Sequence, residues 1–271
     1  MELRRDLLVK NAVRDFLACC RLFRSIKGRG FTSHDDFLLL HRWIGTSSEK
    51  GPFWRLKDAC HLLWRDADPA SHPHPFLFDW LVGAAFHEAM KLKECAYLVS
   101  RYEPAFSGIP LLARAQGGEN SKCRLFFQQT KADISSIVER MECLFSRGLE
   151  EVVEIVAQER SNPILLRYLV EEPPECRELL APMGGVPYLL SRMFPQGIQF
   201  AYTAAGESYL EGGWYAEARL AFQRALELDP GLPEARKGLT ILEKRLQELR
   251  LHLAGAGPQA GEPVRRERTG S

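Results

Sequence analysis

The sequence predicts an all-α protein, on the strength of three observations. Apolar residues recur at intervals of three and four along most of the chain, which is the spacing of one helix face. Sustained alternation of apolar and polar residues, the pattern of a half-buried strand, does not occur. Glycine and proline lie between the periodic segments, where they end and begin helices. We therefore expect an N-terminal helical bundle, then short helices, and finally a helical hairpin with a capping helix.

The N-terminal bundle is expected to span residues 1–112 and to begin with a helix over 7–26. Two glycines shortly after this helix end it. Thr32 or Ser33 can cap the second helix, because a hydroxyl accepts a hydrogen bond from a free N–H of the first turn. Asp36 follows in that turn, where the helix dipole favours a negative charge.

Two further helices complete the predicted bundle. Pro52 suits the first position of a third helix, and Pro75 that of a long fourth helix, since proline lacks the N–H that the first turn leaves unpaired. The fourth helix is expected to end near residue 102, because Pro104 disrupts a helix interior. The polar, glycine-containing stretch 113–121 is then predicted to be a linker between domains.

The middle region, residues 122–195, is predicted to hold one longer helix followed by short ones. The longer helix spans about 120–144, and Gly148 is expected to separate it from another helix at 152–157. Prolines then open the short helices, beginning with Pro163.

Composition and charge exclude several classes of protein. The formal net charge of +1 gives no general attraction to nucleic acid or to an anionic membrane surface. The N-terminus lacks the apolar core of a signal peptide, and no apolar stretch is long enough to span a membrane. The seven cysteines are scattered without a C-x-x-C pair, which indicates reduced, buried thiols rather than disulfides or a zinc site. We expect a cytoplasmic protein without a cofactor.

Residues 201–230 have the most informative pattern in the chain. Gly212 and Gly213 divide the stretch, which suits a tight turn between two antiparallel helices. Asp229 and Pro230 end the second helix, since a residue before proline avoids helical geometry. On each helix, apolar or small residues recur at helical spacing: Tyr202, Ala205, Gly206 and Tyr209, then Ala218, Phe222, Ala225 and Leu228.

This stretch resembles the tetratricopeptide repeat (TPR), whose pattern is W-x2-L-G-x2-Y, then A-x3-F, then P. Tyr202 stands where the pattern has Trp, and Ala205 where it has Leu. The other signature positions carry the expected residues: Gly206, Tyr209, Ala218, Phe222, Ala225 and Pro230. The resemblance covers about one repeat, and it implies a TPR-like helical hairpin whose apolar side is shared with neighbouring helices.

The segment after the hairpin is expected to be a capping helix and not a second repeat. Its apolar stripe continues to about residue 253, but Thr240 and Glu243 stand where the signature has glycine and tyrosine. The TPR-like repeat with its capping helix is thus assigned to residues 196–253. Residues 254–271 are too polar to pack and are predicted to be a disordered tail.

The resemblance also implies a partner-binding surface on the first helix of the hairpin. The family's ligand-facing positions correspond here to Phe200, Thr203, Glu207, Leu210 and Glu211. Family members that clamp a partner's terminal carboxylate use a lysine and an asparagine, whereas this chain has Thr203 and Glu207. A partner with apolar and basic groups is therefore expected to fit better than an acidic tail. The alternative is that a single repeat only packs against the preceding domain.

Histidine and tryptophan are concentrated between residues 34 and 87, which suggests a different kind of site. Imidazoles are common metal ligands, so His61, His72, His74 and His87 are candidates for a metal site. The spacing lacks an H-E-x-x-H pair, and the competing interpretation is surface histidines beside a tryptophan-rich core.

The same region places arginine and lysine beside tryptophan, as in Arg42-Trp43 and Trp54-Arg55. Such pairs can bind nucleic-acid bases, but nearby aspartates dilute the charge and no basic stripe is present, so nucleic-acid binding is not expected. Nor does the sequence contain a nucleophile elbow, a cysteine–histidine dyad motif or a phosphate-binding loop.

The function predicted from the sequence is that of a non-catalytic adaptor or scaffold. In this hypothesis the C-terminal repeat binds another protein or peptide, without a role for membranes or nucleic acid. The alternative is a helical protein that binds a metal or small ligand in its histidine- and tryptophan-rich N-terminal region.

Overall fold

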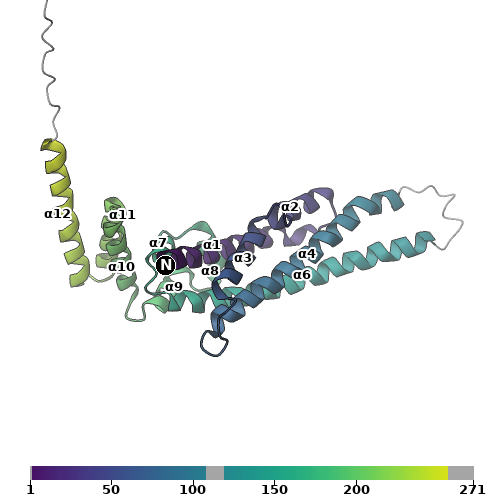
Figure 1. The fold of residues 1–271 in the computed structure, drawn as a ribbon, viewed down its shortest axis with the longest axis horizontal. Helices are drawn as coiled ribbons and strands as arrows, with labels where there is room; N and C mark the ends of the chain where they lie inside the picture. The colour runs from purple at the N-terminus through teal and green to yellow at the C-terminus, as the bar shows by residue number, and fades with distance from the viewer. Residues whose placement is uncertain (1, 108–118, 256–271) are drawn as a thin grey trace, which may run out of the picture. The chain divides into compact units, whose positions relative to one another are not determined.

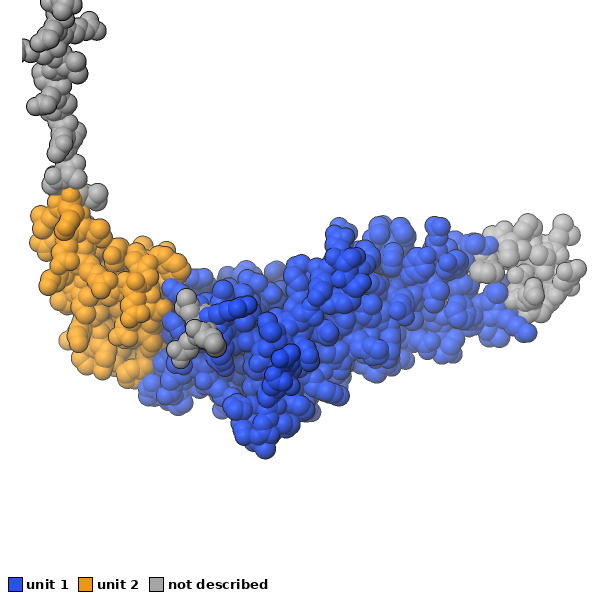
Figure 2. All heavy atoms as spheres, viewed as in Figure 1, with its two compact units in different colours: residues 1–198 blue, residues 199–271 orange. Residues whose placement is uncertain are grey.

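The computed structural model describes residues 2–107 and 119–255, and over these ranges it consists of helices, loops and one isolated bridge between Gly45 and Lys50. The predicted all-α fold is confirmed. The chain forms two compact units, residues 1–198 and residues 199–271 (Figure 2). None of the described helices has both the length and the apolar character needed to cross a membrane.

Unit 1 is organised around two long antiparallel helices. Its elements in chain order are α1 (Glu2–Ile26), η1 (Lys27–Arg29), α2 (His34–Ile44), α3 (Pro52–Trp64), α4 (Pro73–Ser107), α6 (Glu119–Gln158), α7 (Pro163–Val170), α8 (Pro174–Leu180), η2 (Ala181–Met183) and α9 (Gly185–Met193). Helices α4 and α6 lie side by side (Figure 1). Ion pairs join them at Arg140 with Glu88, 2.8 Å, and at Lys131 with Glu103, 2.7 Å.

The structure corrects the predicted end of the fourth helix and the predicted domain division. Helix α4 begins at Pro73 and continues to Ser107 with Pro104 inside it. Packing against α6 outweighs the local cost of the proline, as tertiary contacts often outweigh propensity. The helices on both sides of the predicted linker therefore belong to one unit. Of that linker, 113–118 lies outside the described residues, and the rest begins α6.

Gly148 does not end a helix as predicted, because α6 runs through it from Glu119 to Gln158. An added Cβ at Gly148 would lie 2.4 Å from Cζ of Phe16, a side chain of α1 that is 1% exposed. Glycine is thus needed here for the close approach of α1 and α6, and not for a turn.

Aromatic side chains form much of the core of unit 1. The ring of Phe16 meets that of Phe78 edge-on at 4.9 Å between centroids. Trp43 stacks on Phe53 at 4.9 Å, and Phe53 meets Phe86 at 5.5 Å. Pairs of this geometry contribute about 0.5–1.5 kcal/mol beyond the burial of their area. Most of these aromatic residues near the N-terminus therefore serve packing, whereas Trp80 is 59% exposed.

The start of α2 has the cap that the sequence predicts. The Ser33 hydroxyl accepts a hydrogen bond from the backbone N–H of Asp36 at 3.1 Å and donates one to its carboxylate at 2.7 Å. The Arg29 guanidinium also donates to this carboxylate. Burial by itself raises the pKa of Asp36, but the hydrogen bonds from Ser33 and Arg29 outweigh it, so that the pKa lies below its usual value.

Replacing Asp36 by asparagine is expected to lower the free energy of unfolding by about 1 kcal/mol at neutral pH. Because the folded-state pKa lies below the unfolded one, the carboxylate stabilises the fold above about pH 4, and this contribution is lost as the pH falls through the folded pKa. Urea unfolding of both proteins from neutral to acidic pH measures the effect. The difference between them should shrink on acidification, and a constant difference would contradict the assigned cause.

Unit 2 is built from α10 (Ile198–Glu211), α11 (Tyr215–Leu228) and α12 (Pro233–Gly255). The turn between α10 and α11 contains Gly213 at φ 77°, in the left-handed region that favours glycine. The ring of Phe222 on α11 is fully buried. An added Cβ would lie 2.7 Å from this ring at Gly206 of α10 and 2.4 Å from it at Gly238 of α12. Three helices thus pack around one ring.

Helix α12 has the character of the predicted capping helix. It buries Ala235 and Leu242, while Thr240 and Glu243 are exposed. A further repeat would need apolar or small residues at the latter two positions, so the surface of α12 does not support another packed helix there. Of the predicted tail, residues 254 and 255 belong to α12, and 256–271 lies outside the described residues.

Candidate functional site

The five predicted partner-binding residues all lie on α10, but they differ in exposure. Glu207 and Glu211 are exposed and stand one helical turn apart. Phe200 is half-buried. Thr203 and Leu210 are buried, with 5% and 7% of their surface exposed. The accessible part of the predicted site is therefore an acidic pair with part of an aromatic ring.

Thr203 and Leu210 make contacts that serve the fold of unit 2. The Thr203 hydroxyl donates a hydrogen bond to the Gln199 carbonyl of the same helix, at 2.9 Å. The Leu210 carbonyl accepts a hydrogen bond from Nη1 of Arg245 on α12, at 3.4 Å. The bond from Arg245 joins α12 to the end of α10, and the same carbonyl also accepts a hydrogen bond from the Gly213 N–H at 3.2 Å.

The two exposed carboxylates create a negative patch. Side chains four residues apart on a helix are neighbours, and like charges there destabilise it by about 0.2–0.5 kcal/mol. Within the described part of unit 2, neither Glu207 nor Glu211 lies within 4.0 Å of a cationic nitrogen. A cation from another molecule would relieve this repulsion, so the patch suits a basic group.

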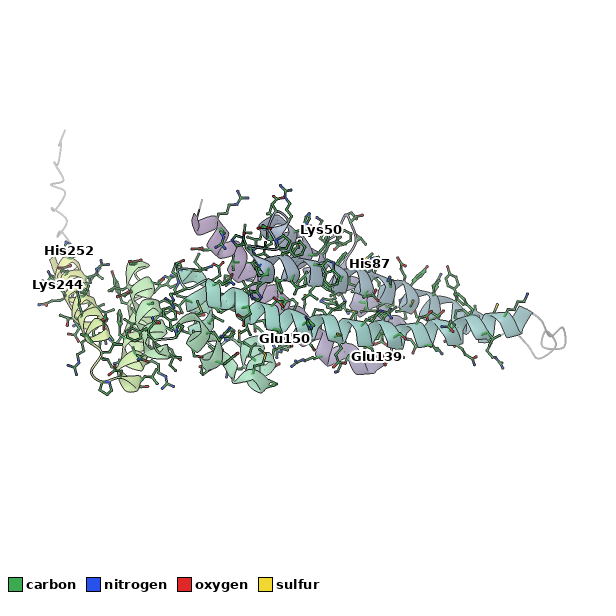
Figure 3. All side chains as sticks on the ribbon, turned by 90° about the horizontal axis from the view of Figure 1, so that it is seen from below. Lys50, His87, Glu139, Glu150, Lys244 and His252 are labelled. Atoms are coloured by element: carbon green, nitrogen blue, oxygen red, sulfur yellow. The ribbon has the colours of Figure 1, made fainter. Side chains whose placement is uncertain are left out.

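The four histidines considered for a metal site are not brought together. His61 on α3 has its Nδ1 3.5 Å from Oδ2 of Asp79 on α4. His72 is exposed in the loop before α4, and His87 is exposed on α4 (Figure 3). Among the residues that the structure describes, no group of three or more histidine, cysteine, aspartate or glutamate side chains is arranged to hold a metal ion.

His74 has a structural partner that the sequence alone did not indicate. Its Nδ1 lies 2.8 Å from Oε2 of Glu151, which is 8% exposed on α6. A buried carboxylate needs a hydrogen-bonding partner, and His74 supplies it from the first turn of α4. The contact joins the beginning of α4 to the C-terminal part of α6.

A pocket with a histidine and a tryptophan in its wall lies beside the loop before α4. It has a volume of about 590 Å³, and Trp64 and His72 are among its lining residues. Arg5 and Glu159 also line it and pair with each other at 2.6 Å. This pocket offers room for the small ligand of the alternative hypothesis. Its charged groups Arg5 and Glu159 are already paired with each other, however, so they are not free to bind a ligand.

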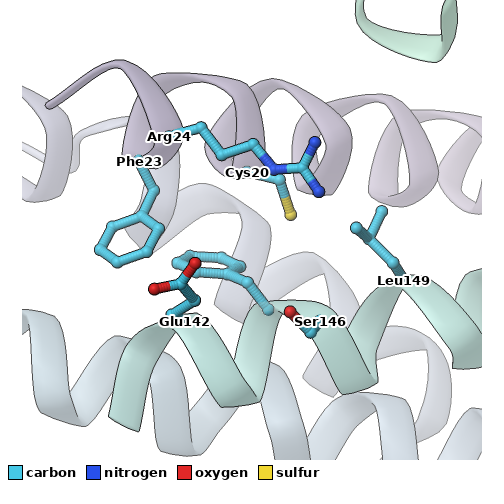
Figure 4. Close-up of a pocket in the computed structure, with 7 residues that line it drawn as sticks. Cys20, Phe23, Arg24, Glu142, Ser146 and Leu149 are labelled. Atoms are coloured by element: carbon cyan, nitrogen blue, oxygen red, sulfur yellow. The ribbon is translucent and has the colours of Figure 1, made fainter. Parts of the chain in front are cut away.

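A smaller cavity lies between α1 and α6 and contains the Cys20 thiol (Figure 4). Its volume of about 40 Å³ holds a few water molecules at most and is far below that of a typical ligand site. Burial raises the pKa of Cys20 well above its usual value, and raises that of Cys19 to about 12. These thiols therefore stay protonated and lack the thiolate that a nucleophile needs.

The tryptophans beside basic residues are packing groups. Trp43 is buried on Phe53, and Trp54 meets the ring of Phe86 at 5.2 Å. Lys57 also lies over Phe86, 5.9 Å from the ring centroid. Neither Trp43 nor Trp54 therefore offers a free ring face on which a nucleic-acid base could stack.

The tetratricopeptide repeat family matches residues 199–232, which confirms the resemblance found in the sequence. The match covers α10 and α11 and ends just before α12. In comparisons with curated proteins and with solved structures, nothing matches the chain. The repeat suggests a protein-interaction module in unit 2.

Proposed function

We propose that this chain is a non-catalytic adaptor whose repeat binds a protein segment carrying basic and apolar side chains. The observation that carries this proposal is the exposed pair Glu207 and Glu211 on α10, which has no cation within 4.0 Å in the described part of unit 2. Carboxylates one turn apart can receive a lysine or arginine from a partner, and this charge complementarity selects the partner.

Phe200 extends the proposed surface with an apolar group. It lies on α10 two turns before Glu207 and is half-buried. An apolar side chain of the partner can cover the remaining exposed part of the ring, which adds affinity without a change in charge. Thr203 and Leu210 are buried, and the hydrogen bond from Arg245 of α12 to the Leu210 carbonyl would help to keep α10 in place.

Unit 1 supports the adaptor proposal through its construction. Its long helices α4 and α6 are joined by ion pairs, and Phe16 of α1 packs against Phe78 of α4 and Phe145 of α6. The buried Cys19 and Cys20 thiols have raised pKa values and are unsuited to nucleophilic catalysis. These features favour binding over chemistry.

A peptide-display selection on the immobilised full chain tests the proposal. We expect the enriched peptides to combine lysine or arginine with apolar residues. Reversing both charges, Glu207→Lys with Glu211→Lys, should lower their affinity roughly tenfold or more, because attraction becomes repulsion.

Glu217→Lys provides the matched control, since Glu217 is also an exposed glutamate but lies on α11. This variant should keep the binding of the wild-type chain. Enrichment of acidic peptides, or equal binding by the double variant, would refute the proposed surface.

A further inference from the structure

The end of the sequence has the composition that the proposed surface of α10 would bind. The tail, residues 256–271, follows α12 and lies outside the described residues. Within it, residues 263–268 are PVRRER, so that three arginines stand beside a proline and a valine. This is the combination of basic and apolar side chains that suits Glu207 and Glu211. The chain itself thus contains a segment of the chemistry that its repeat would recognise.

The end of α12 lies near the acidic pair. Three successive helices joined by short turns place α10 and α12 parallel, and both pack against Phe222 of α11, at Gly206 and Gly238. Arg245 of α12 donates a hydrogen bond to the carbonyl at the C-terminal end of α10, so the two helices are level there. Gly255, ten residues after Arg245, ends α12 about 15 Å further along the helix axis.

The ten residues from Gly255 to Arg265 can span the way back to α10. An extended chain covers about 3.3 Å per residue, and thus about 33 Å in total. The return to Glu211 is about 18 Å, because it combines about 15 Å along the axis with the roughly 8–10 Å that separates packed helices. Gly257 and Gly261 lie in this connection, where glycine permits a reversal of the chain.

The spacing of the arginines matches that of the carboxylates. In an extended segment, alternate side chains point to the same side and stand about 6.6 Å apart. Arg266 and Arg268 would therefore face one side, and Glu267 between them the other. Glu207 and Glu211, one turn apart on α10, are separated by about 6 Å along the helix axis. Each of the two arginines can thus meet one carboxylate.

Another exposed glutamate of unit 2 suits the arginines less well. Glu248 on α12 is nearer to the tail in the sequence, but Arg245 stands three residues before it and Arg250 two residues after it. These cations weaken the attraction for a further one. Glu207 and Glu211 are instead two like charges with no cationic nitrogen within 4.0 Å in the described part of unit 2.

We propose that residues 263–268 bind Glu207 and Glu211 of the same chain and compete there with the partner segment. This inference rests on the proposed function of α10, because it assigns one surface to both ligands. A segment tethered in this way has an effective concentration in the millimolar range, so a weak contact is enough to occupy the surface in part. An external segment must displace the tail, which restricts binding to partners of higher affinity.

Amide NMR spectra of the full chain test the contact without any partner. A synthetic peptide of residues 256–271 gives the resonance positions of the unbound tail. In the wild-type chain the amides of 264–268 should be displaced from these positions, and Glu207→Lys with Glu211→Lys should remove most of the displacement. Glu217→Lys, on α11, is the matched control and should leave it unchanged. Sodium chloride at about 0.5 M should act like the double variant, because it screens exposed charges.

Tail amides at the free-peptide positions in the wild-type chain would overturn the proposal, as would an equal displacement in the double variant. A displacement that grows with protein concentration would place the tail on another copy and refute the contact within one chain. Spectra at about 0.05 and 0.5 mM should therefore agree, since a tethered segment has a fixed effective concentration.

The competition is measured with the basic peptide obtained by selection. Replacing the three arginines together, Arg265→Ser, Arg266→Ser and Arg268→Ser, should lower the Kd of this peptide about two- to tenfold, because the surface is no longer partly occupied. An unchanged Kd would refute the competition. Since the spectra involve no partner, a tail contact without peptide binding would refute the proposed function alone, and peptide binding without a tail contact would refute this inference alone.

Discussion

Phe222→Ala is expected to unfold unit 2. Removing a fully buried phenylalanine ring costs about 3–5 kcal/mol. At about 0.05–0.15 kcal/mol per residue, the described part of unit 2, residues 199–255, has only about 3–9 kcal/mol of stability. The cavity cannot close easily, because the ring is held between Gly206 and Gly238, which have no side chains to fill the space. All three helices of the unit depend on this contact.

Hydrogen exchange followed by mass spectrometry measures this effect in the full chain. Peptides from α10, α11 and α12 should lose their protection in Phe222→Ala, while those from α4 and α6 keep it. Leu220→Ala on the same helix is the control: Leu220 is 66% exposed, and the change should stay within about 0.5 kcal/mol. Protection of α10 and α12 in the phenylalanine variant would show that the ring does not hold them together.

Gly148→Val is expected to lower the free energy of unfolding of unit 1 by about 3 kcal/mol. A Cβ there lies 2.4 Å from the Phe16 ring, which cannot move aside because Phe78 and Phe145 stand 4.9 and 5.9 Å from it. The helices α1 and α6 must therefore separate or the ring must leave its rotamer.

Gly83→Val is the matched control for this substitution. Gly83 also lies inside a long helix, α4, but an added Cβ meets no atom within 4 Å. Valine there should change stability by less than about 0.5 kcal/mol, since its helix propensity is close to that of glycine. Chemical unfolding of both variants gives the comparison, and equal losses would mean that helix propensity, and not the contact with Phe16, sets the cost.

Local chemistry explains why some elements could be predicted from the sequence. The Ser33 cap with Asp36 and the glycine turn at Gly213 depend only on residues that are neighbours in the chain. The TPR signature likewise combines short-range spacings with small residues at close contacts, and its family match confirms the hairpin.

Long-range contacts explain what the sequence did not indicate. The local sequence predicts a helix end at Gly148, because the residue that requires a glycine there, Phe16, lies far away in the chain. The pairs His74 with Glu151 and Arg5 with Glu159 have the same origin, since only the folded chain brings them together.

Only part of the candidate site could be predicted from the sequence. The exposure of Glu207 and Glu211 follows from the repeat pattern. The family's ligand-facing positions assume an array of repeats, however, whereas this chain has one matched repeat followed by a capping helix. Thr203 and Leu210 are accordingly buried, where the pattern alone indicated contact with a partner.

A reciprocal charge swap tests the adaptor proposal most directly. Fluorescence anisotropy would measure the Kd of the selected basic peptide, and of the same peptide with glutamate in place of each lysine and arginine, for the wild-type chain and for Glu207→Lys with Glu211→Lys. We expect the wild-type chain to bind only the basic peptide, with an affinity that falls as salt is added, and the double variant to prefer the acidic one. An unchanged preference in the double variant would contradict recognition by the acidic face of α10.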